Sequence, residues 1–244
     1  NLVIESKRII TCFLIAPLIA IVPISFSVSP FMLFTEGMLA WPPEPEAWSL
    51  RWYKNMIGDC SADVVSSTVP CSTKWMVGTV NSFYIGIIAT VIATALGTLA
   101  ALGLSRPHMP YKGLIMAILI SPMIVPLIIT AAGMFFFYAR INLVYTFTGV
   151  ILAHVALATP FVVITVTATL VGFDMNMVKA AQSLGAKPMR TFFKVIMPLI
   201  LPGIISGALF AFITSFDEVV VVMFMASIDQ LTIPKQMWAG IRQE

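Results

Sequence analysis

Five long stretches without charged residues dominate the hydrophobic pattern of the chain. They cover residues 9–28, 77–104, 114–138, 148–170 and 199–225, and the last is interrupted only by Asp217 and Glu218. A helix needs about 20 residues to cross the hydrocarbon core of a bilayer, which is about 30 Å thick. None of the stretches alternates polar and apolar residues as barrel strands do. The pattern therefore predicts an all-α membrane protein, a polytopic bundle with five membrane-spanning helices.

The composition agrees with a location in the membrane. Hydrophobic residues make up 59% and charged residues 10% of the 244 residues, whereas soluble domains are about 25% charged. Because so few polar side chains cannot coat a soluble globule, the excess apolar surface must face lipid. The first stretch follows Lys7 and Arg8 as in a signal peptide, but it is as long as a full crossing and no small-residue cleavage site ends it. The net charge of +3 is too small to indicate nucleic acid binding.

The basic residues predict the orientation of the bundle. With a cytoplasmic N-terminus, residues 1–8, 105–113 and 171–195 lie inside and hold 8 of the 14 Lys and Arg residues in 42 positions. The outer segments, residues 35–74, 139–147 and 226–244, hold the other 6 in 68 positions. Cytoplasmic loops carry an excess of Lys and Arg, so we expect the N-terminus inside and residues 35–74 to form an extracytoplasmic loop.

Two of the three cysteines, Cys60 and Cys71, fall in this outer loop. An extracytoplasmic loop faces an oxidising compartment, in which disulfides form and persist. The pair is therefore a disulfide candidate, with two free thiols as the alternative.

The inner segment of residues 171–197 is polar enough to leave the membrane but keeps helical periodicity. Four apolar residues fall at i, i+3, i+4 and i+7: Met177, Ala180, Ala181 and Leu184. Gly185 follows as a C-terminal cap residue would. A second helical piece begins after Pro188, with Phe192 and Ile196 on one side. Pro198 then begins the next span. Such an elbow can either lie on the lipid surface or fit a groove on a soluble partner.

The same segment carries a family resemblance. The pattern Lys179-Ala180-Ala181-x-x-x-Gly185, followed by Ile196-x-Pro198, resembles the EAA loop of permease subunits of binding-protein-dependent ATP-binding-cassette (ABC) importers, with Lys179 where that family usually has Glu. The resemblance implies that residues 171–197 form a cytoplasmic coupling loop that docks on the ATPase. Its implied coupling residues are Met177, Lys179, Ala180, Ala181, Leu184, Gly185, Phe192, Ile196 and Pro198.

The likeness extends along the chain and narrows to spermidine/putrescine-type permeases. It rests on Ser49-Leu-Arg-Trp-Tyr53, Ser121-Pro122-x-Ile124-Val125, His154 followed by Pro160-Phe161-Val162-Val163, and Ser215-Phe-Asp217-Glu218-Val-Val-Val221. It implies the type I ABC importer permease (MetI-like) fold as a single transmembrane permease domain over residues 1–244. That fold has six helices, so we expect five of six here and a fragment or truncated product, since the chain starts at Asn1 and stops at Glu244.

The resemblance also implies the function and the partners. The chain would be the channel-forming subunit of an importer for a small cationic solute, most simply a polyamine, in the bacterial inner membrane. Its expected partners are a second permease in a heterodimer, an ABC ATPase dimer that holds ATP and Mg²⁺, an external solute-binding protein and the lipid membrane. The sequence lacks a Gly-x-x-x-x-Gly-Lys-Ser/Thr phosphate loop, so we expect ATP to bind to the partner ATPase and no cofactor to bind to this chain. It also lacks a Cys/His metal spacing and a Ser/His/Asp set, so we expect no metal and no enzymatic activity in this chain.

Asp217 and Glu218 are the candidate substrate-binding residues. In a continuous fifth helix they would lie inside the bilayer, about 12 Å from its outer end. Carboxylates at such depth are costly and would attract an ammonium group. The alternative is that the pair is neutralised structurally, by protonation or by hydrogen bonds to a partner subunit. Other classes of function remain: an ion- or proton-coupled secondary transporter, a membrane scaffold, or an ABC permease for an opine or amino-acid derivative.

Two further features are interpreted structurally. His154 is alone in the fourth stretch, and such a residue is expected to make a hydrogen bond between helices rather than to bind a ligand. Gly203-x-x-x-Gly207 with Ala208 forms a small face suited to close helix contact, which we assign to a subunit interface.

Overall fold

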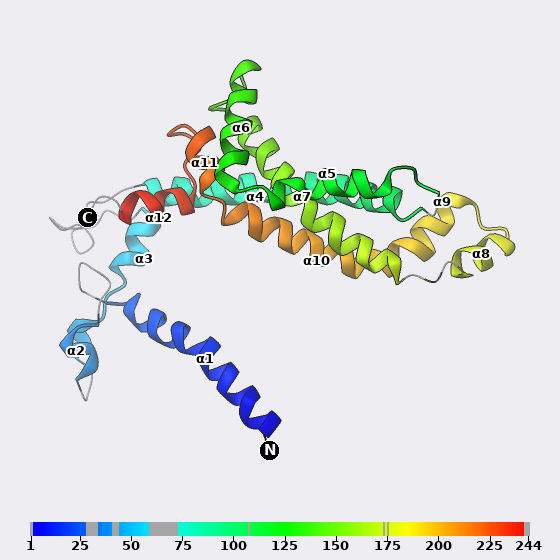
Figure 1. The fold of residues 1–244 in the computed structure, drawn as a ribbon. Helices are drawn as coiled ribbons and strands as arrows, with labels where there is room; N and C mark the ends of the chain where they lie inside the picture. Colours follow the sequence, from blue (N-terminus) through cyan, green and yellow to red (C-terminus); the bar gives the residue numbers. More distant parts are fainter. Residues whose placement is uncertain are drawn as a thin grey trace. The chain divides into compact units, whose positions relative to one another are not determined.

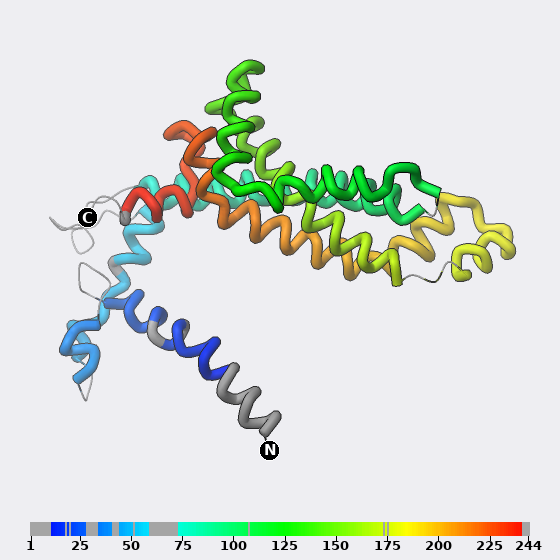
Figure 2. Tube along the Cα trace, viewed as in Figure 1, coloured from blue at the N-terminus to red at the C-terminus, as the bar shows by residue number. Residues whose placement is uncertain are grey.

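The computed structural model describes the backbone of residues 2–27, 34–40, 44–58, 73–106, 108–172, 174 and 176–241. Figure 2 draws in grey the residues whose placement is uncertain. The chain divides into two compact units, Asn1–Met76 and Val77–Glu244.

The first unit consists of helices and turns. Its elements are α1 (Leu2–Ile24), α2 (Glu36–Leu39), the 3₁₀ turn η1 (Pro45–Ala47) and α3 (Arg51–Met56). Two contacts join the end of α1 to the segment of η1 and α3. Ser27 forms an antiparallel bridge with Trp48, and Ser25 Oγ lies 2.7 Å from the Tyr53 hydroxyl. The predicted outer loop therefore contains short helices. Cys60 and Cys71 lie outside the described residues, so the disulfide stays a prediction.

The second unit is a helical bundle. Its elements are α4 (Lys74–Leu104, whose first turn belongs to the first unit), α5 (Lys112–Ile124), α6 (Leu127–Arg140), α7 (Phe147–Val171), α8 (Asn176–Ser183), α9 (Pro188–Thr191), the π-helical turn η2 (Phe192–Ile196), α10 (Met197–Phe216), α11 (Val220–Met225) and α12 (Ile233–Ile241). Helices α4, α7 and α10 run side by side (Figure 1). Among these three, α7 is the most buried, so the core lies along it.

Glycines allow the three long helices to approach closely. Val162 of α7 lies between Gly97 of α4 and Gly207 of α10: a Cβ on Gly97 would come within 2.7 Å of Val162 Cβ, and one on Gly207 within 3.0 Å of Val162 Cα. A Cβ on Gly203 would overlap Thr169 of α7. The Gly203–Gly207 face is thus buried within the chain against α7, and its assignment to a subunit interface was wrong.

The helices confirm a multi-pass arrangement and change the shape of one predicted span. Within the described residues, three helices are long and apolar enough to cross a membrane: Lys74–Leu104, Phe147–Val171 and Pro188–Phe216. The predicted third span is two helices, α5 and α6, bent by 103°, so four crossings result if this pair counts as one. In the first stretch the apolar helical part, Thr11–Ile24, is shorter, and its crossing remains a prediction.

Proline explains the bend between α5 and α6. Val125 has an extended backbone (φ −72°, ψ 138°), the conformation that a residue before proline prefers. Pro126 is the N-cap residue of the next helix and has no N–H to continue the previous one. The sequence stretch of residues 114–138 is therefore uniformly apolar but is not one straight helix.

Candidate functional site

The fifth apolar stretch breaks at the two carboxylates. Helix α10 ends at Phe216, residues 217–219 are not helical, and α11 begins at Val220. The predicted continuous helix over residues 199–225 was therefore wrong, and the depth of 12 Å derived from it no longer holds. No proline or glycine marks this break.

The bend between α5 and α6 and the break after α10 meet at one pocket. A cavity of about 420 Å³ is lined by Leu127, Ile213, Thr214, Asp217, Glu218, Val219 and Val220. Leu127 is the first residue of α6, directly after the 103° bend, and α11 packs against α6 (Figure 1). The volume is within the usual range for small-molecule sites. Irregular backbone at membrane depth is tolerated where it lines such a cavity.

Glu218 caps the helix that follows it. Its Oε1 accepts a hydrogen bond of 2.9 Å from the backbone N–H of Val221, in the first turn of α11. The side chain is buried, with 8% of its surface exposed. A helix N-terminus has N–H groups without intrahelical partners, and a carboxylate stabilises it. Glu218 therefore has a structural role in the break.

Asp217 has the opposite environment. It is exposed and is the C-cap residue of α10, with its N–H bonded to Ile213 O at 3.0 Å. Within the described part of the chain, its carboxylate has no hydrogen bond and no ion pair. The last carbonyls of a helix lack donors, and the negative end of the helix dipole favours cations. Asp217 is thus the carboxylate that gains more from a bound cation.

His154 joins α7 to the end of α10. Its Nδ1 lies 2.8 Å from Ser215 Oγ, and both side chains are buried. The expected hydrogen bond between helices is confirmed. The sequence did not identify Ser215 as the partner, although this residue begins the Ser215-Phe-Asp217-Glu218 motif that carries part of the family resemblance.

The elbow is formed as predicted in its first half. Helix α8 ends at Ser183, and Gly185 follows with φ +78°, a left-handed conformation that favours glycine. The apolar stripe faces outward: Met177 is 51% and Leu184 88% exposed, whereas Val178 is buried against the chain. Lys179 and Ala180 are exposed and Ala181 half-buried.

The second half of the elbow differs from the prediction. The helical piece that begins at Pro188 continues without interruption through η2 into α10, so Pro198 does not open a separate span. Phe192 and Ile196 are half-buried in η2. Pro198 has no N–H for the carbonyl of Lys194, and the local π-helical turn accommodates this missing bond. One helix, Pro188–Phe216, therefore connects the elbow to the carboxylate break.

Polar residues near the start of α4 hold the segment between α11 and α12, which sequence reasoning left as an outer loop. Asn81 Nδ2 donates to Asp229 O at 2.8 Å and to Leu231 O at 2.9 Å. Ser82 Oγ accepts from Ile233 N at 2.9 Å. The Lys235 ammonium donates to Ala226 O at 2.9 Å, and burial lowers the pKa of this side chain. The signal in the sequence was the adjacent polar pair Asn81 and Ser82 within an otherwise apolar stretch, which indicates a polar contact there.

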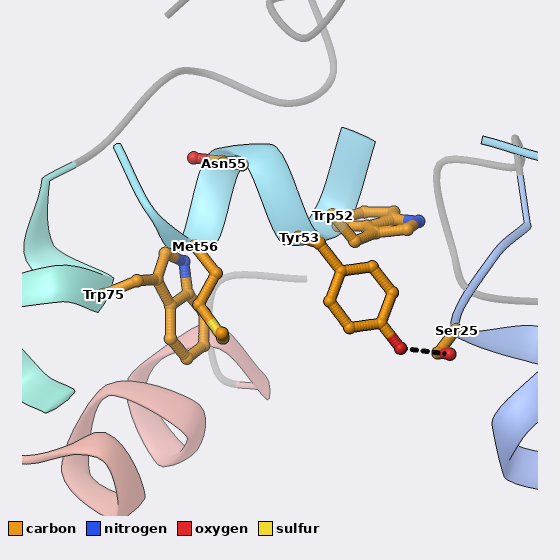
Figure 3. Close-up of a pocket in the computed structure, with 6 residues that line it drawn as sticks. All are labelled: Ser25, Trp52, Tyr53, Asn55, Met56 and Trp75. Atoms are coloured by element: carbon orange, nitrogen blue, oxygen red, sulfur yellow. Dashed lines mark hydrogen bonds between the residues drawn. The ribbon is translucent and has the colours of Figure 1, made fainter. Parts of the chain in front are cut away.

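The first unit has an aromatic pocket of its own. It has a volume of about 240 Å³ and is lined by Ser25, Trp52, Tyr53, Asn55, Met56 and Trp75 (Figure 3). Figure 3 shows Tyr53 turned toward Ser25, with Trp75 and Met56 on the other side of the pocket. Three aromatic side chains, Trp52, Tyr53 and Trp75, therefore line this pocket.

Long apolar helices, two broken spans around a carboxylate and an exposed amphipathic elbow define a membrane transport subunit. Residues 93–242 match the family model of the binding-protein-dependent transport system inner membrane component, and the chain belongs to this family. It is therefore a multi-pass membrane component of such a transport system.

Characterised relatives cover most of the chain. The chain is 27% identical over 234 residues to the spermidine/putrescine transport system permease protein PotC of Haemophilus influenzae, covering 96% of this chain and 82% of the relative. It is 28% identical over 238 residues to the putrescine transport system permease protein PotI of Escherichia coli, covering 94% and 76%. These matches agree with the resemblance to spermidine/putrescine-type permeases.

A solved structure supports the fold. The crystal structure of a bacterial ABC transporter involved in the import of the acidic polysaccharide alginate matches with a TM-score of 0.69 and 15% identity, covering 97% of this chain and 77% of that chain. The predicted fold class, an all-α importer permease, is confirmed.

Proposed function

We propose that the chain is the channel-forming subunit of an ATP-driven importer that moves a small cationic solute, a polyamine such as spermidine or putrescine, into the bacterial cytoplasm. The observation that carries this proposal is the exposed Asp217 carboxylate at the point where both broken spans meet. The names of the relatives PotC and PotI support the substrate class.

The pocket matches the chemistry of a polyamine. An ammonium group has three N–H donors and no acceptor, and Asp217 together with the free carbonyls at the end of α10 supplies acceptors. The apolar side chains of Leu127, Ile213 and Val220 line the same pocket and suit the methylene groups between ammoniums. Glu218 lines the same pocket, and its Oε1 keeps the cap on α11. The second permease of a heterodimer would close the site from the other side.

The elbow would couple this site to a motor. The exposed stripe of Met177 and Leu184 would fit an apolar groove on an ABC ATPase dimer that binds ATP and Mg²⁺. Because Pro188–Phe216 is one helix of 29 residues, about 40 Å long, a tilt applied at the elbow moves the end that carries Asp217. An external solute-binding protein would deliver the cation. This chain would hold no cofactor. Its N-terminus would lie in the cytoplasm.

The test is uptake of labelled spermidine or putrescine by the complete importer in proteoliposomes. Asp217→Asn should raise the KM for uptake at least tenfold, because the neutral amide loses the ionic attraction. Glu218→Gln should have a smaller effect, since an amide oxygen still accepts from Val221. Asp229→Asn, an exposed carboxylate outside the pocket, is the charge-matched control.

Two outcomes would contradict the proposal. Unchanged uptake kinetics in Asp217→Asn would remove the cation site. Uptake driven by a proton gradient without ATP would favour a secondary transporter instead.

A further inference from the structure

Two further cavities lie along α4 and at its C-terminal end, and neither shares a lining residue with the carboxylate pocket. The first is an apolar groove of about 600 Å³ between α4 and the helix that contains η2 and α10. Its α4 wall runs from Thr90 to Leu102 and includes Ala95 and Leu99; its other wall includes Phe193. Leu99 is 66% exposed. The groove is therefore an apolar surface on a membrane-spanning helix that the described part of the second unit leaves uncovered.

The second cavity is basic and adjoins the end of the groove. It has a volume of about 540 Å³ and is lined by Gly103, Arg106, His108, Met109 and Pro110, in the connection between α4 and α5. Gly103 follows Leu102 directly and lies one helical turn after Leu99 on α4. This connection and α9 lie at the same end of the bundle (Figure 1). The groove thus leads along one helix to the basic pocket.

The charge of this pocket is uncompensated. Residues 105–113 include Arg106 and Lys112 and no acidic residue. In the described ranges, the Arg106 side chain has neither a hydrogen bond nor an ion pair, and it is exposed. An arginine guanidinium binds phosphate through two parallel hydrogen bonds. The pocket is therefore complementary to a phosphate group at the membrane surface.

The dimensions match one leaflet of a bilayer. Thr90 and Leu102 are twelve residues apart, about 18 Å along the helix axis, and one leaflet contributes about 15 Å of hydrocarbon. Two other occupants fit only half of this arrangement. A free phosphate would bind at Arg106 but leave the groove empty, and a purely apolar helix would fill the groove but leave Arg106 without a partner. We propose that the groove and the basic pocket together bind one anionic phospholipid, with an acyl chain along α4 and its phosphate at Arg106. By the predicted orientation, this lipid belongs to the inner leaflet.

The experiment is native mass spectrometry of the complete importer, purified in detergent and titrated with phosphatidylglycerol or phosphatidylcholine. The wild type should bind phosphatidylglycerol more tightly. Arg106→Gln should weaken phosphatidylglycerol binding about fivefold, the effect of one basic residue near an anionic headgroup. Ala95→Trp should fill the groove and abolish the binding. Arg140→Gln, an exposed charge at the end of α6, and Leu96→Trp, an exposed α4 position outside the groove, are the matched controls.

Several results would overturn the proposal. Equal binding of both lipids would remove the headgroup site. Unchanged phosphatidylglycerol binding in Ala95→Trp, or complete competition by inorganic phosphate, would indicate a free-anion site. Crosslinking of an Ala95→Cys variant to the second permease would show that a protein covers the groove. If Ala95→Trp fails to assemble, Leu99→Ser carries the same expectation without added bulk. The readout is lipid binding, so it is independent of the substrate proposed above.

Discussion

The imidazole of His154 and the hydroxyl of Ser215 are joined by a hydrogen bond of 2.8 Å in the core of the bundle. It links the N-terminal third of α7 to the last turn of α10, two residues before Asp217. Because α10 ends at Phe216, this bond fixes the direction in which the chain leaves the helix. We infer that the pair positions the carboxylate break without touching the substrate.

Removal of this bond should destabilise the bundle measurably. Ser215→Ala leaves the buried His154 Nδ1 without a partner, and we expect a loss of about 0.5 to 2 kcal/mol in the free energy of unfolding. Thermal unfolding of the purified importer, in a double-mutant cycle with His154→Ala, measures the coupling. Ser206→Ala, an exposed serine on the same helix, is the control. A coupling energy near zero would show that the two side chains are independent.

Close packing of α10 on α7 gives a second prediction. A Cβ on Gly207 would lie 2.5 Å from Thr165 Oγ1 and 3.0 Å from Val162 Cα, so Gly207→Ala must separate the helices. We expect a destabilisation of about 1 to 3 kcal/mol, seen as a lower unfolding midpoint and a lower yield of assembled importer. Gly133→Ala on α6 meets nothing within 4 Å and should be neutral or slightly stabilising. Equal behaviour of the two variants would refute this packing.

These predictions also show how far the sequence determines the fold. The length of the apolar stretches predicted both ends of α7 to within one residue and the end of α4, whose start lies three residues earlier than predicted. This works because a helix surrounded by lipid and other helices needs no polar face. The bend at Pro126 had a visible cause in the sequence, but a Pro inside a membrane helix is often tolerated, so residue type alone did not distinguish a kink from a break.

The break at Asp217 was harder to foresee. It contains no Pro or Gly, and it depends on Glu218 reaching the Val221 N–H, a contact that periodicity does not encode. Likewise, the spacing of Gly203 and Gly207 predicted a close helix contact. It did not predict that the contact is with Thr165 and Thr169 of the same chain. Pairing between distant segments is set by tertiary packing, and one sequence carries no direct record of it.

The turn of the elbow gives a third prediction. Gly185 has φ +78°, a conformation that costs a residue with a Cβ roughly 1 to 2 kcal/mol. Gly185→Ala should therefore change the angle between α8 and α9 and reduce the coupling between ATP hydrolysis and uptake. The measurement is the ratio of solute imported to ATP hydrolysed in proteoliposomes. Gly172→Ala, a glycine before the same elbow with an ordinary φ of −79°, should leave the ratio unchanged, and an equal loss in both would exclude the turn as the cause.

The exposed stripe of α8 gives the last prediction. Leu184 is 88% exposed, so it contributes little to the stability of this chain, and Leu184→Asp should leave the permease folded. If the stripe is seated in an apolar groove of the ATPase, the buried carboxylate has no partner there and the complex should dissociate. We expect the ATPase to be lost from the purified importer while the second permease is retained, as measured by subunit stoichiometry after size-exclusion chromatography. Gln182→Asp introduces the same charge on the opposite face of α8 and should retain the ATPase. Retention of the ATPase by Leu184→Asp would mean that the stripe rests on the lipid surface, the other arrangement that its periodicity allows.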